Sequence, residues 1–134
     1  MQATNLKEAK NKPLGVDGSR ALDPNEFGKF LGIATWLMTC SAEHKGLPIS
    51  WLSERVLPAL LLKQFKIIMK NNTPIAFLTW ATVSQDVADK LATGKTILTL
   101  PEWRSGKQVV VVDCVSPFGP ADQIEQNFLD GVKK

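Results

Sequence analysis

The first clear pattern of hydrophobic and polar positions begins after a polar start and has the period of a helix. Asp23 can cap this helix, Pro24 suits its first turn, and Glu26 lies three residues after the cap, as in a capping box. Apolar side chains then recur at spacings of three and four, at Phe27, Phe30, Leu31, Ala34, Leu37 and Met38. This pattern predicts a helix over about residues 24–41.

A second, shorter helix and two strands follow. Ser50 can cap the helix, and Pro58 is expected to end or kink it because proline clashes with the preceding helical turn. Strand-forming residues then occupy about 64–70 and 75–82, on either side of an Asn-Asn pair. Because asparagine favours turns, we expect these two segments to form a hairpin.

The last third of the chain holds a helix, a very apolar strand and a final helix. Ser84 can cap the first of these helices, and Gly94 lies just past its end. The segment 107–115 contains four consecutive valines, too apolar for a strand with one wet face, so we expect it to lie centrally in a sheet. The sequence Pro-Phe-Gly-Pro at 117–120 ends this strand before the last helix.

This order of elements predicts an α/β domain in which helices cover a small mixed sheet. The domain is expected to extend over residues 23–134. Residues 1–22 show no apolar period, so we expect a flexible polar tail there.

Composition narrows the class of protein. The 134 residues are 44% hydrophobic and 22% charged, with a net charge of +3, which is typical of an ordinary globular domain. The mild charge argues against a dedicated nucleic-acid binder. No apolar run suits a membrane span or a signal peptide. Two cysteines make no disulfide framework, so we expect a cytoplasmic protein with both thiols free.

The candidate chemistry centres on one histidine and one carboxylate. His44 is the only imidazole, a group that titrates near neutral pH as a general base requires; an exposed loop histidine without a role is the alternative. Asp113 interrupts the valine strand, where a partly buried carboxylate needs a partner, so it is either functional or an anchor for backbone amides. A carboxylate can fix an imidazole and stabilise its charged form, so the two could act as a base and its partner.

The cysteines offer a competing kind of site. Cys40 and Cys114 could ligate a metal together with His44 and Asp113, but a paired CxxC spacing is missing. Strand alternation also places Asp113 and Cys114 on opposite faces, so we expect no metal site. A nucleophilic cysteine is a second possibility, and we favour inert packing thiols over both.

The most basic part of the chain is the segment 41–70, which contains Arg55 and several lysines. One interpretation is a solvated face of the molecule. The other is a docking patch, formed by Lys63, Lys66 and Lys70, for an acidic protein or a phosphate-bearing carrier.

Two further residues could position a substrate. Ser41 either does so or caps the end of the first helix. The four tryptophans either fill the core or line an acyl-chain channel, with Trp80 as the substrate-positioning residue. The sequence pattern alone does not decide between these alternatives.

Six ordered motifs together resemble the toxin-activating lysine acyltransferases, the hemolysin-activating family. The resemblance covers about residues 27–131, and the six motifs in this order are more specific to the family than any one of them alone. The motifs are Trp36-Leu37-Met38 with Ser41-Ala42-Glu43-His44-Lys45, Val56-Leu57-Pro58-Ala59-Leu60, Gln64-Phe65, Pro74-Ile75-Ala76-Phe77-Leu78-Thr79-Trp80-Ala81, Glu102-Trp103-Arg104-Ser105-Gly106 and Val112-Asp113-Cys114-Val115-Ser116-Pro117-Phe118-Gly119.

The resemblance implies an N-acetyltransferase-like (GNAT-like) fold, here shortened at its C-terminus, with no bound cofactor. Such enzymes take a fatty acyl group from acyl carrier protein and place it on internal lysines of an inactive protoxin. The essential histidine of the family lies in a Ser-x-x-His motif and falls on His44, and the serine of that motif falls on Ser41. The essential aspartate, before the Pro-Phe-Gly turn, falls on Asp113.

We therefore expect a protein-lysine fatty acyltransferase that uses acyl carrier protein as donor and a protoxin or bacteriocin-type protein as substrate. His44 would be the general base, oriented and charge-stabilised by Asp113, and transient acylation of His44 stays open. A non-catalytic accessory or immunity-type binding protein of a toxin or microcin system is one alternative. A thiol-dependent acyl hydrolase using Cys114 or Cys40 is another. A sheet that stops after Val109–Val115 would leave an apolar edge, so we also expect a homodimer that covers it.

Overall fold

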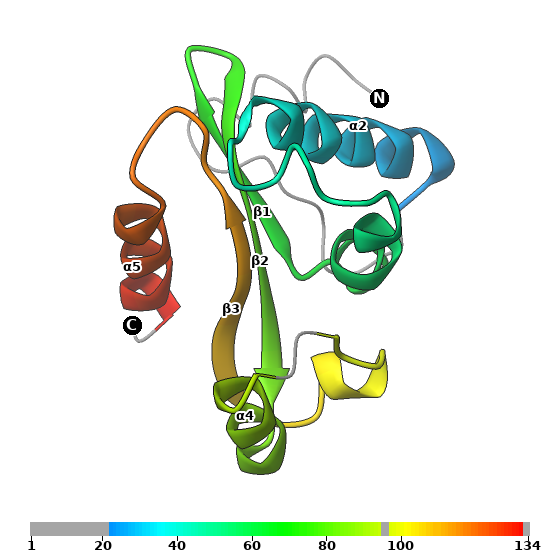
Figure 1. Ribbon diagram of the computed structural model, residues 1–134, viewed down its shortest axis with the longest axis vertical. Coiled ribbons are helices and arrows are strands. Elements are labelled where there is room, and N and C mark those ends of the chain that lie inside the picture. The colour runs from blue at the N-terminus through cyan, green and yellow to red at the C-terminus, as the bar shows by residue number, and fades with distance from the viewer. Residues whose placement is uncertain (1–21, 95–96, 133–134) are drawn as a thin grey trace.

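Three antiparallel strands in the order β1-β2-β3 form the sheet at the centre of the fold. The computed structural model describes residues 22–94 and 97–132; β1 is Phe65–Lys70, β2 is Thr73–Val83 and β3 is Gln108–Val115 (Figure 1). The predicted class, helices combined with a small sheet, is confirmed. Two details of the prediction were wrong. Within the described residues the sheet is antiparallel rather than mixed, and β2 rather than β3 lies in its middle.

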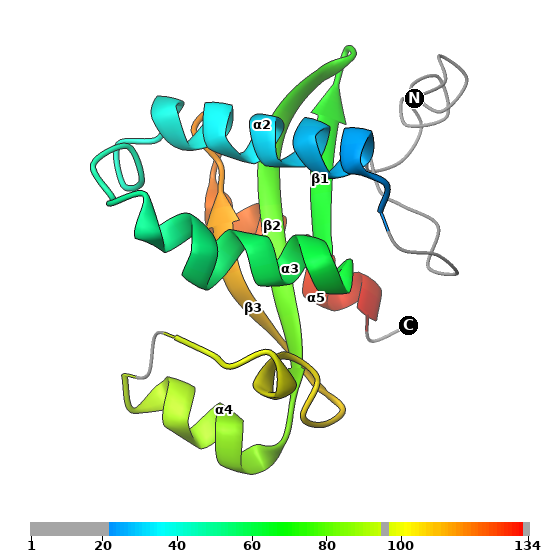
Figure 2. The same cartoon turned by 90° about the vertical axis from the view of Figure 1, so that its right-hand side faces the viewer.

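Helices cover both faces of this sheet. α2 (Pro24–Cys40), the π-helix η1 (Leu52–Val56) and α3 (Leu57–Leu62) lie on one face, and α5 (Ala121–Val132) lies on the other (Figures 1 and 2). The core lies between the sheet and the α2–α3 layer. Its largest fully buried side chains include Phe30, Leu37, Leu60, Ile67, Phe77 and Trp103. Within the described ranges, no helix is long and apolar enough to cross a membrane.

Local signals in the sequence account for the start of α2 and for the hairpin. The N–H of Glu26 donates to the Asp23 carboxylate at 2.8 Å, and the N–H of Asp23 donates to the Glu26 carboxylate at 3.2 Å. This is the predicted capping box. Asn71 and Asn72 connect β1 to β2 with φ angles of 51° and 66°. Asparagine tolerates this left-handed region, so the predicted hairpin is confirmed.

The chain stays helical through Pro58, with an irregular turn just before it. Pro58 lies in the first turn of α3, which continues to Leu62 and ends at Lys63 with a left-handed φ of 57°. Just before it, the N–H of Leu57 donates to the carbonyl of Leu52, five residues back, which makes a wide π turn. In an α-helix proline clashes with the carbonyl four residues earlier, and a wider turn relieves that clash. Pro58 therefore does not end the helix, and the wide turn before it is the kind of irregularity that the expected end or kink allows for.

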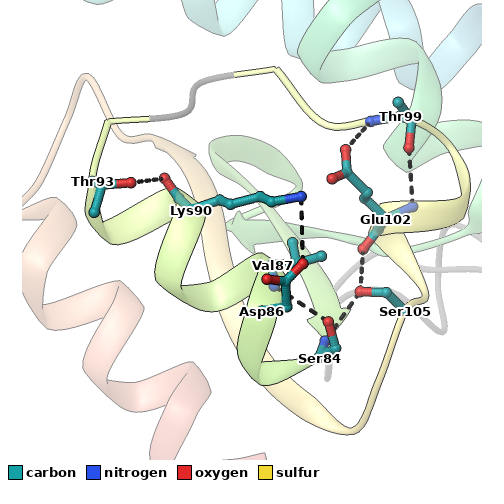
Figure 3. Close-up of polar contacts among 8 residues, drawn as sticks. All are labelled: Ser84, Asp86, Val87, Lys90, Thr93, Thr99, Glu102 and Ser105. Carbon is teal, nitrogen blue, oxygen red and sulfur yellow. Dashed lines mark hydrogen bonds and ion pairs between the residues drawn. The ribbon is translucent and has the colours of Figure 1, made fainter.

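α4 (Gln85–Ala92) and the 3-10 helix η2 (Pro101–Trp103) form a corner at the end of β2 that is remote from the hairpin. The Ser84 hydroxyl accepts the N–H of Val87 at 3.3 Å, which confirms the predicted cap. The N–H of Ser84 in turn donates to the Ser105 hydroxyl at 3.0 Å (Figure 3). The loop after η2 is thereby tied to the start of α4.

Gln64 connects this corner to the sheet. Its buried side-chain amide donates to the carbonyls of Trp80 and Trp103 at 3.0 Å each. Its side-chain oxygen accepts from Nε of Arg104 at 2.7 Å. The motif at 102–106, which contains Trp103 and Arg104, therefore has a structural role, because it supplies hydrogen-bond partners for the buried Gln64 side chain.

The tail predicted at residues 1–22 lies, apart from residue 22, outside the described residues. Leu22 itself packs against the core. The description of a single domain over residues 23–134 stays a prediction.

Candidate active site

A bulge in β3 determines where Asp113 points. Thr79 of β2 pairs with Asp113, whereas the next residue, Trp80, pairs with Val111, so Val112 is an extra residue in β3. A bulge interrupts the regular alternation of side chains between the two faces. Val112 packs against the core, and Asp113 also contacts residues on the face that α2 and α3 cover.

Cys114 points to the opposite face of the sheet, as its spacing from Asp113 predicts. Its Sγ lies 4.0 Å from the carbonyl oxygen of Ala121, at the start of α5. Burial raises the pKa of Cys114 to about 12, and the carboxylates of Glu125, Asp113 and Asp122 add to this effect. A thiol that is protonated at neutral pH is a weak nucleophile. In the part of the chain that the structure describes, no cluster of His, Cys, Asp and Glu could hold a metal.

Arg55, in the π turn of η1, binds Asp113. Its Nε donates to Oδ2 of Asp113 at 2.8 Å, and its Nη2 donates to the carbonyl of Val112 at 2.9 Å. The N–H of Asp113 donates to the hydroxyl of Thr79 at 3.2 Å. The Arg55 and Asp113 side chains are only 16% and 15% exposed, so the pair is largely shielded from water. Loss of either partner would leave a charge that is costly to bury.

Three influences set the pKa of Asp113. Burial is the largest and raises the pKa above its ordinary value. The Arg55 guanidinium lowers it through charge and hydrogen bonding, and a positive charge on His44 lowers it as well. His44 therefore lies close enough for the two charges to interact. In the part of the chain that the structure describes, no hydrogen bond joins the His44 ring to the Asp113 carboxylate. The ionisation of Asp113 thus depends on its cationic neighbours.

His44 is held by residues close to it in sequence. It lies in the loop that follows α2, where Ser41 ends the helix. Nδ1 of His44 lies 2.6 Å from the buried Ser41 hydroxyl, and the ring stands edge-on to Trp51, with ring centroids 5.6 Å apart. Ser41 therefore both ends α2 and contacts the histidine. With Nδ1 engaged, Nε2 is the ring nitrogen left to meet a substrate.

The structure does not bring Trp80 to this group. The Trp80 ring packs against Phe128 of α5, with centroids 5.0 Å apart. That contact lies on the face of the sheet opposite to α2 and α3. A role for Trp80 in positioning a substrate beside His44 stays a prediction, and this contact does not support it.

The three lysines of the predicted docking patch have different surroundings. Lys63 ends α3, and Lys70 is exposed at the hairpin end of β1. Nζ of Lys66 lies 5.7 Å from the centroid of the Phe128 ring, and Lys66 lines a small pocket of about 120 Å³ beneath α5. A carrier bound at Lys66 would therefore contact the sheet face opposite to His44, and the docking role stays a prediction.

Arg55 is the site residue that sequence reasoning missed. The sequence places it in the basic segment 41–70, and the resemblance argues against an assisting role, because many members of the family have Asn or another neutral residue at this position. The signal that points to it is the need of a buried carboxylate for a cation. However, 58 residues separate Arg55 from Asp113, and no periodicity in the sequence links the two.

The fold and the site define an α/β protein with a histidine and a carboxylate on one face of a small sheet, which suits proton transfer. The sequence model of the RTX toxin acyltransferase family matches residues 23–133. The chain therefore belongs to the RTX toxin acyltransferase family, and the resemblance noted from its motifs is confirmed.

Individual relatives agree with this assignment. The chain is 34% identical over 106 residues to the protein-lysine myristoyltransferase RtxC of Kingella kingae, covering 76% of this chain and 64% of RtxC. It is 32% identical over 91 residues to the protein-lysine myristoyltransferase HlyC of Escherichia coli, covering 68% of this chain and 52% of HlyC. An uncharacterized Synechocystis protein is 31% identical over 106 residues, which cover 78% of this chain and 72% of that protein. The chain spans between about half and two thirds of the length of the acyltransferases it matches.

Proposed function

We propose that this chain is a protein-lysine fatty acyltransferase that modifies an RTX protoxin or a bacteriocin-type protein. The observation that carries the proposal is the placement of His44 and Asp113 on one face of the sheet, within the segment that matches the family. Two relatives carry the name protein-lysine myristoyltransferase, which supports a fatty acyl group as the group transferred.

His44 is the general base of this proposal. For Nε2 to accept a proton, Nδ1 carries the other hydrogen and donates it to the Ser41 hydroxyl, 2.6 Å away. The substrate's lysine amine attacks the thioester carbonyl, and Nε2 takes the proton that the amine loses. The C–S bond then breaks, and the leaving thiolate takes the proton from His44. The base is neutral again at the end of the cycle.

Asp113 acts on His44 mainly through charge. When His44 holds the extra proton, an ionised carboxylate nearby stabilises the imidazolium. The effect of a charge on His44 on the pKa of Asp113 supports this role. His44 is oriented instead by its hydrogen bond to the Ser41 hydroxyl, and Oδ2 of Asp113 accepts from Arg55.

The donor, the finer fold and the assembly belong to the same proposal. We propose acyl carrier protein as the acyl donor, no bound cofactor, and a GNAT-like fold around the three described strands. No strand pairs with the outer edge of β3 among the described residues, which supports a homodimer that covers this edge. Burial keeps the Cys114 thiol protonated at neutral pH, which argues against a thiol enzyme that uses this cysteine.

A reconstituted reaction tests the proposed function. The purified chain is incubated with myristoyl-acyl carrier protein and an RTX protoxin, and intact-mass spectrometry follows the protoxin, with Escherichia coli HlyC as positive control. We expect the mass of one acyl group to be added per modified lysine, and no addition with His44→Ala. If HlyC modifies the protoxin and this chain does not, the proposal is wrong. Release of free fatty acid without modified protoxin would favour a hydrolase.

A further inference from the structure

Arg55 forms hydrogen bonds with two successive residues of β3. Its Nε and Nη2 donate to the Asp113 carboxylate and to the Val112 carbonyl, at 2.8 and 2.9 Å. The donors of a guanidinium lie in one rigid plane, so these two contacts together fix the guanidinium against this part of β3, and one of them holds Oδ2 of Asp113. Arg55 thus holds the Asp113 side chain against η1 in addition to supplying a charge.

Both partners lie at an irregularity in their own element. Arg55 belongs to the π turn of η1, in which a hydrogen bond spans five residues instead of four. Asp113 directly follows Val112, the extra residue of the bulge in β3. Both irregularities interrupt regular backbone hydrogen bonding, and both occur where the two elements meet. π turns and β-bulges are frequent beside functional sites, where they redirect a side chain.

We propose that Arg55 is a positioning residue for acyl transfer, an inference that rests on the function proposed above. It holds the Asp113 carboxylate in place near His44 and favours the ionised form of that carboxylate. Arg55 acts through Asp113 and does not itself handle the substrate.

The electrostatics of the site give the reason. Burial of Asp113 raises its pKa, and the charge and hydrogen bonds of Arg55 oppose that rise. Without Arg55, Asp113 holds its proton to a higher pH. A protonated carboxyl group carries no charge with which to stabilise the His44 imidazolium. Loss of Arg55 should therefore move the acidic limb of the pH–rate profile to higher pH.

A titration that needs no enzymatic activity tests this directly. The chain is labelled with ¹³C at the aspartate carboxyl carbons, and the Asp113 signal is identified by its absence in Asp113→Asn. In Arg55→Met we expect the pKa of Asp113 to rise by roughly 1–3 units, the usual effect of losing a neighbouring opposite charge. Arg55→Lys keeps the charge and should raise it less. If Arg55→Met does not fold, Arg55→Gln, which keeps a donor but loses the charge, replaces it.

Arg104→Met is the matched control. Arg104 is an exposed arginine that donates to the Gln64 side chain and to the Leu62 carbonyl. Its loss removes hydrogen bonds of the fold without removing a charge from Asp113. We expect it to lower the thermal unfolding midpoint and to leave the pKa of Asp113 unchanged.

The kinetic readout separates this inference from the proposed function. In Arg55→Met the acidic limb of kcat should shift by the same amount as the pKa of Asp113, with little change in the KM for the protoxin. A pKa of Asp113 that is equal in wild type and Arg55→Met overturns the inference, and so does a shifted pKa with an unmoved kcat profile. If the wild type transfers no acyl group, the proposed function fails, and the titration still decides whether Arg55 controls Asp113.

Discussion

The guanidinium of Arg55 and the carboxylate of Asp113 join two segments that lie 58 residues apart in the chain. Their bond, 2.8 Å from Nε to Oδ2, ties η1 to the edge strand β3. His44, in contrast, is held by Ser41, only three residues away. The position of the histidine therefore depends on one turn of the chain, whereas that of the carboxylate depends on the whole fold.

The two cysteines should differ in reactivity. Burial raises the pKa of Cys114 to about 12, whereas Cys40 is exposed. Because the thiolate is the reactive form, Cys114 should react with a disulfide reagent at pH 8 much more slowly than Cys40. Its rate should rise about tenfold per pH unit until the pH approaches this pKa. Stopped-flow measurements on Cys40→Ser and Cys114→Ser separate the two thiols.

The same two residues provide a test of the thiol-dependent alternative. Replacing Cys40 and Cys114 together by alanine should leave acyl transfer at the wild-type rate, because neither thiol takes part in the proposed chemistry. A folded double variant that no longer transfers or hydrolyses the acyl group would contradict the histidine mechanism.

Gly106 and Gly28 form a matched pair that tests the packing of the backbone. A Cβ at Gly106 would lie 2.5 Å from the Val83 carbonyl oxygen and the Ser84 nitrogen, whereas one at Gly28, in α2, meets nothing within 4 Å. Gly106→Ala should lower the free energy of unfolding by roughly 1–3 kcal/mol. Gly28→Ala should raise it by about 0.5–1 kcal/mol. Urea unfolding measures both, and equal effects would contradict the close packing of the loop after η2.

The proposed carrier-docking patch predicts a salt-dependent effect on donor binding. Changing Lys63, Lys66 and Lys70 together to glutamate should raise the KM for acyl carrier protein at low salt. The effect should shrink as salt rises, because exposed charges are screened over ~8–10 Å at physiological ionic strength. Lys90→Glu, on α4 next to Asp86, is the control and should leave this KM unchanged. An unchanged KM in the triple variant would identify the patch as solvated surface.

The outer edge of β3, which no strand of the described ranges covers, predicts a homodimer. Light scattering at micromolar concentration should give twice the mass of the 14.7 kDa chain. We expect the second copy to cover the outer edge of β3, which has no strand partner among the described residues. A stable monomer with full transfer activity would contradict this assembly.

Sequence patterns predicted the elements whose causes are local. The capping box of Asp23 and Glu26 and the Asn71-Asn72 turn each depend on neighbouring residues only, so both were predictable. The position of β3 depends on the whole fold. The core covers one face of β3 and α5 packs on the other, so apolar valines suit both faces of this strand. An edge strand with both faces covered therefore has the same apolar sequence pattern as a central strand.

The candidate site follows the same division. The Ser41–His44 contact is visible as a spacing of three residues, and the valines around Asp113 indicate a partly buried carboxylate. The bulge at Val112, which turns Asp113 toward Arg55, leaves no signature in the sequence. The pairing of Arg55 with Asp113 therefore becomes evident only from the fold.

A double-mutant cycle on His44 and Asp113 tests the central claim most directly. The rate of acyl transfer to the protoxin is measured for His44→Ala, Asp113→Ala and the double variant. The control is Asp130→Ala, at an exposed position of α5. Each single change should lower the rate by about 10²–10⁴-fold, the usual contribution of general acid–base catalysis. The double variant should be little slower than either single one, because the two residues act as a unit. Strictly additive losses in folded variants, or a wild-type rate in Asp113→Ala, would contradict the account.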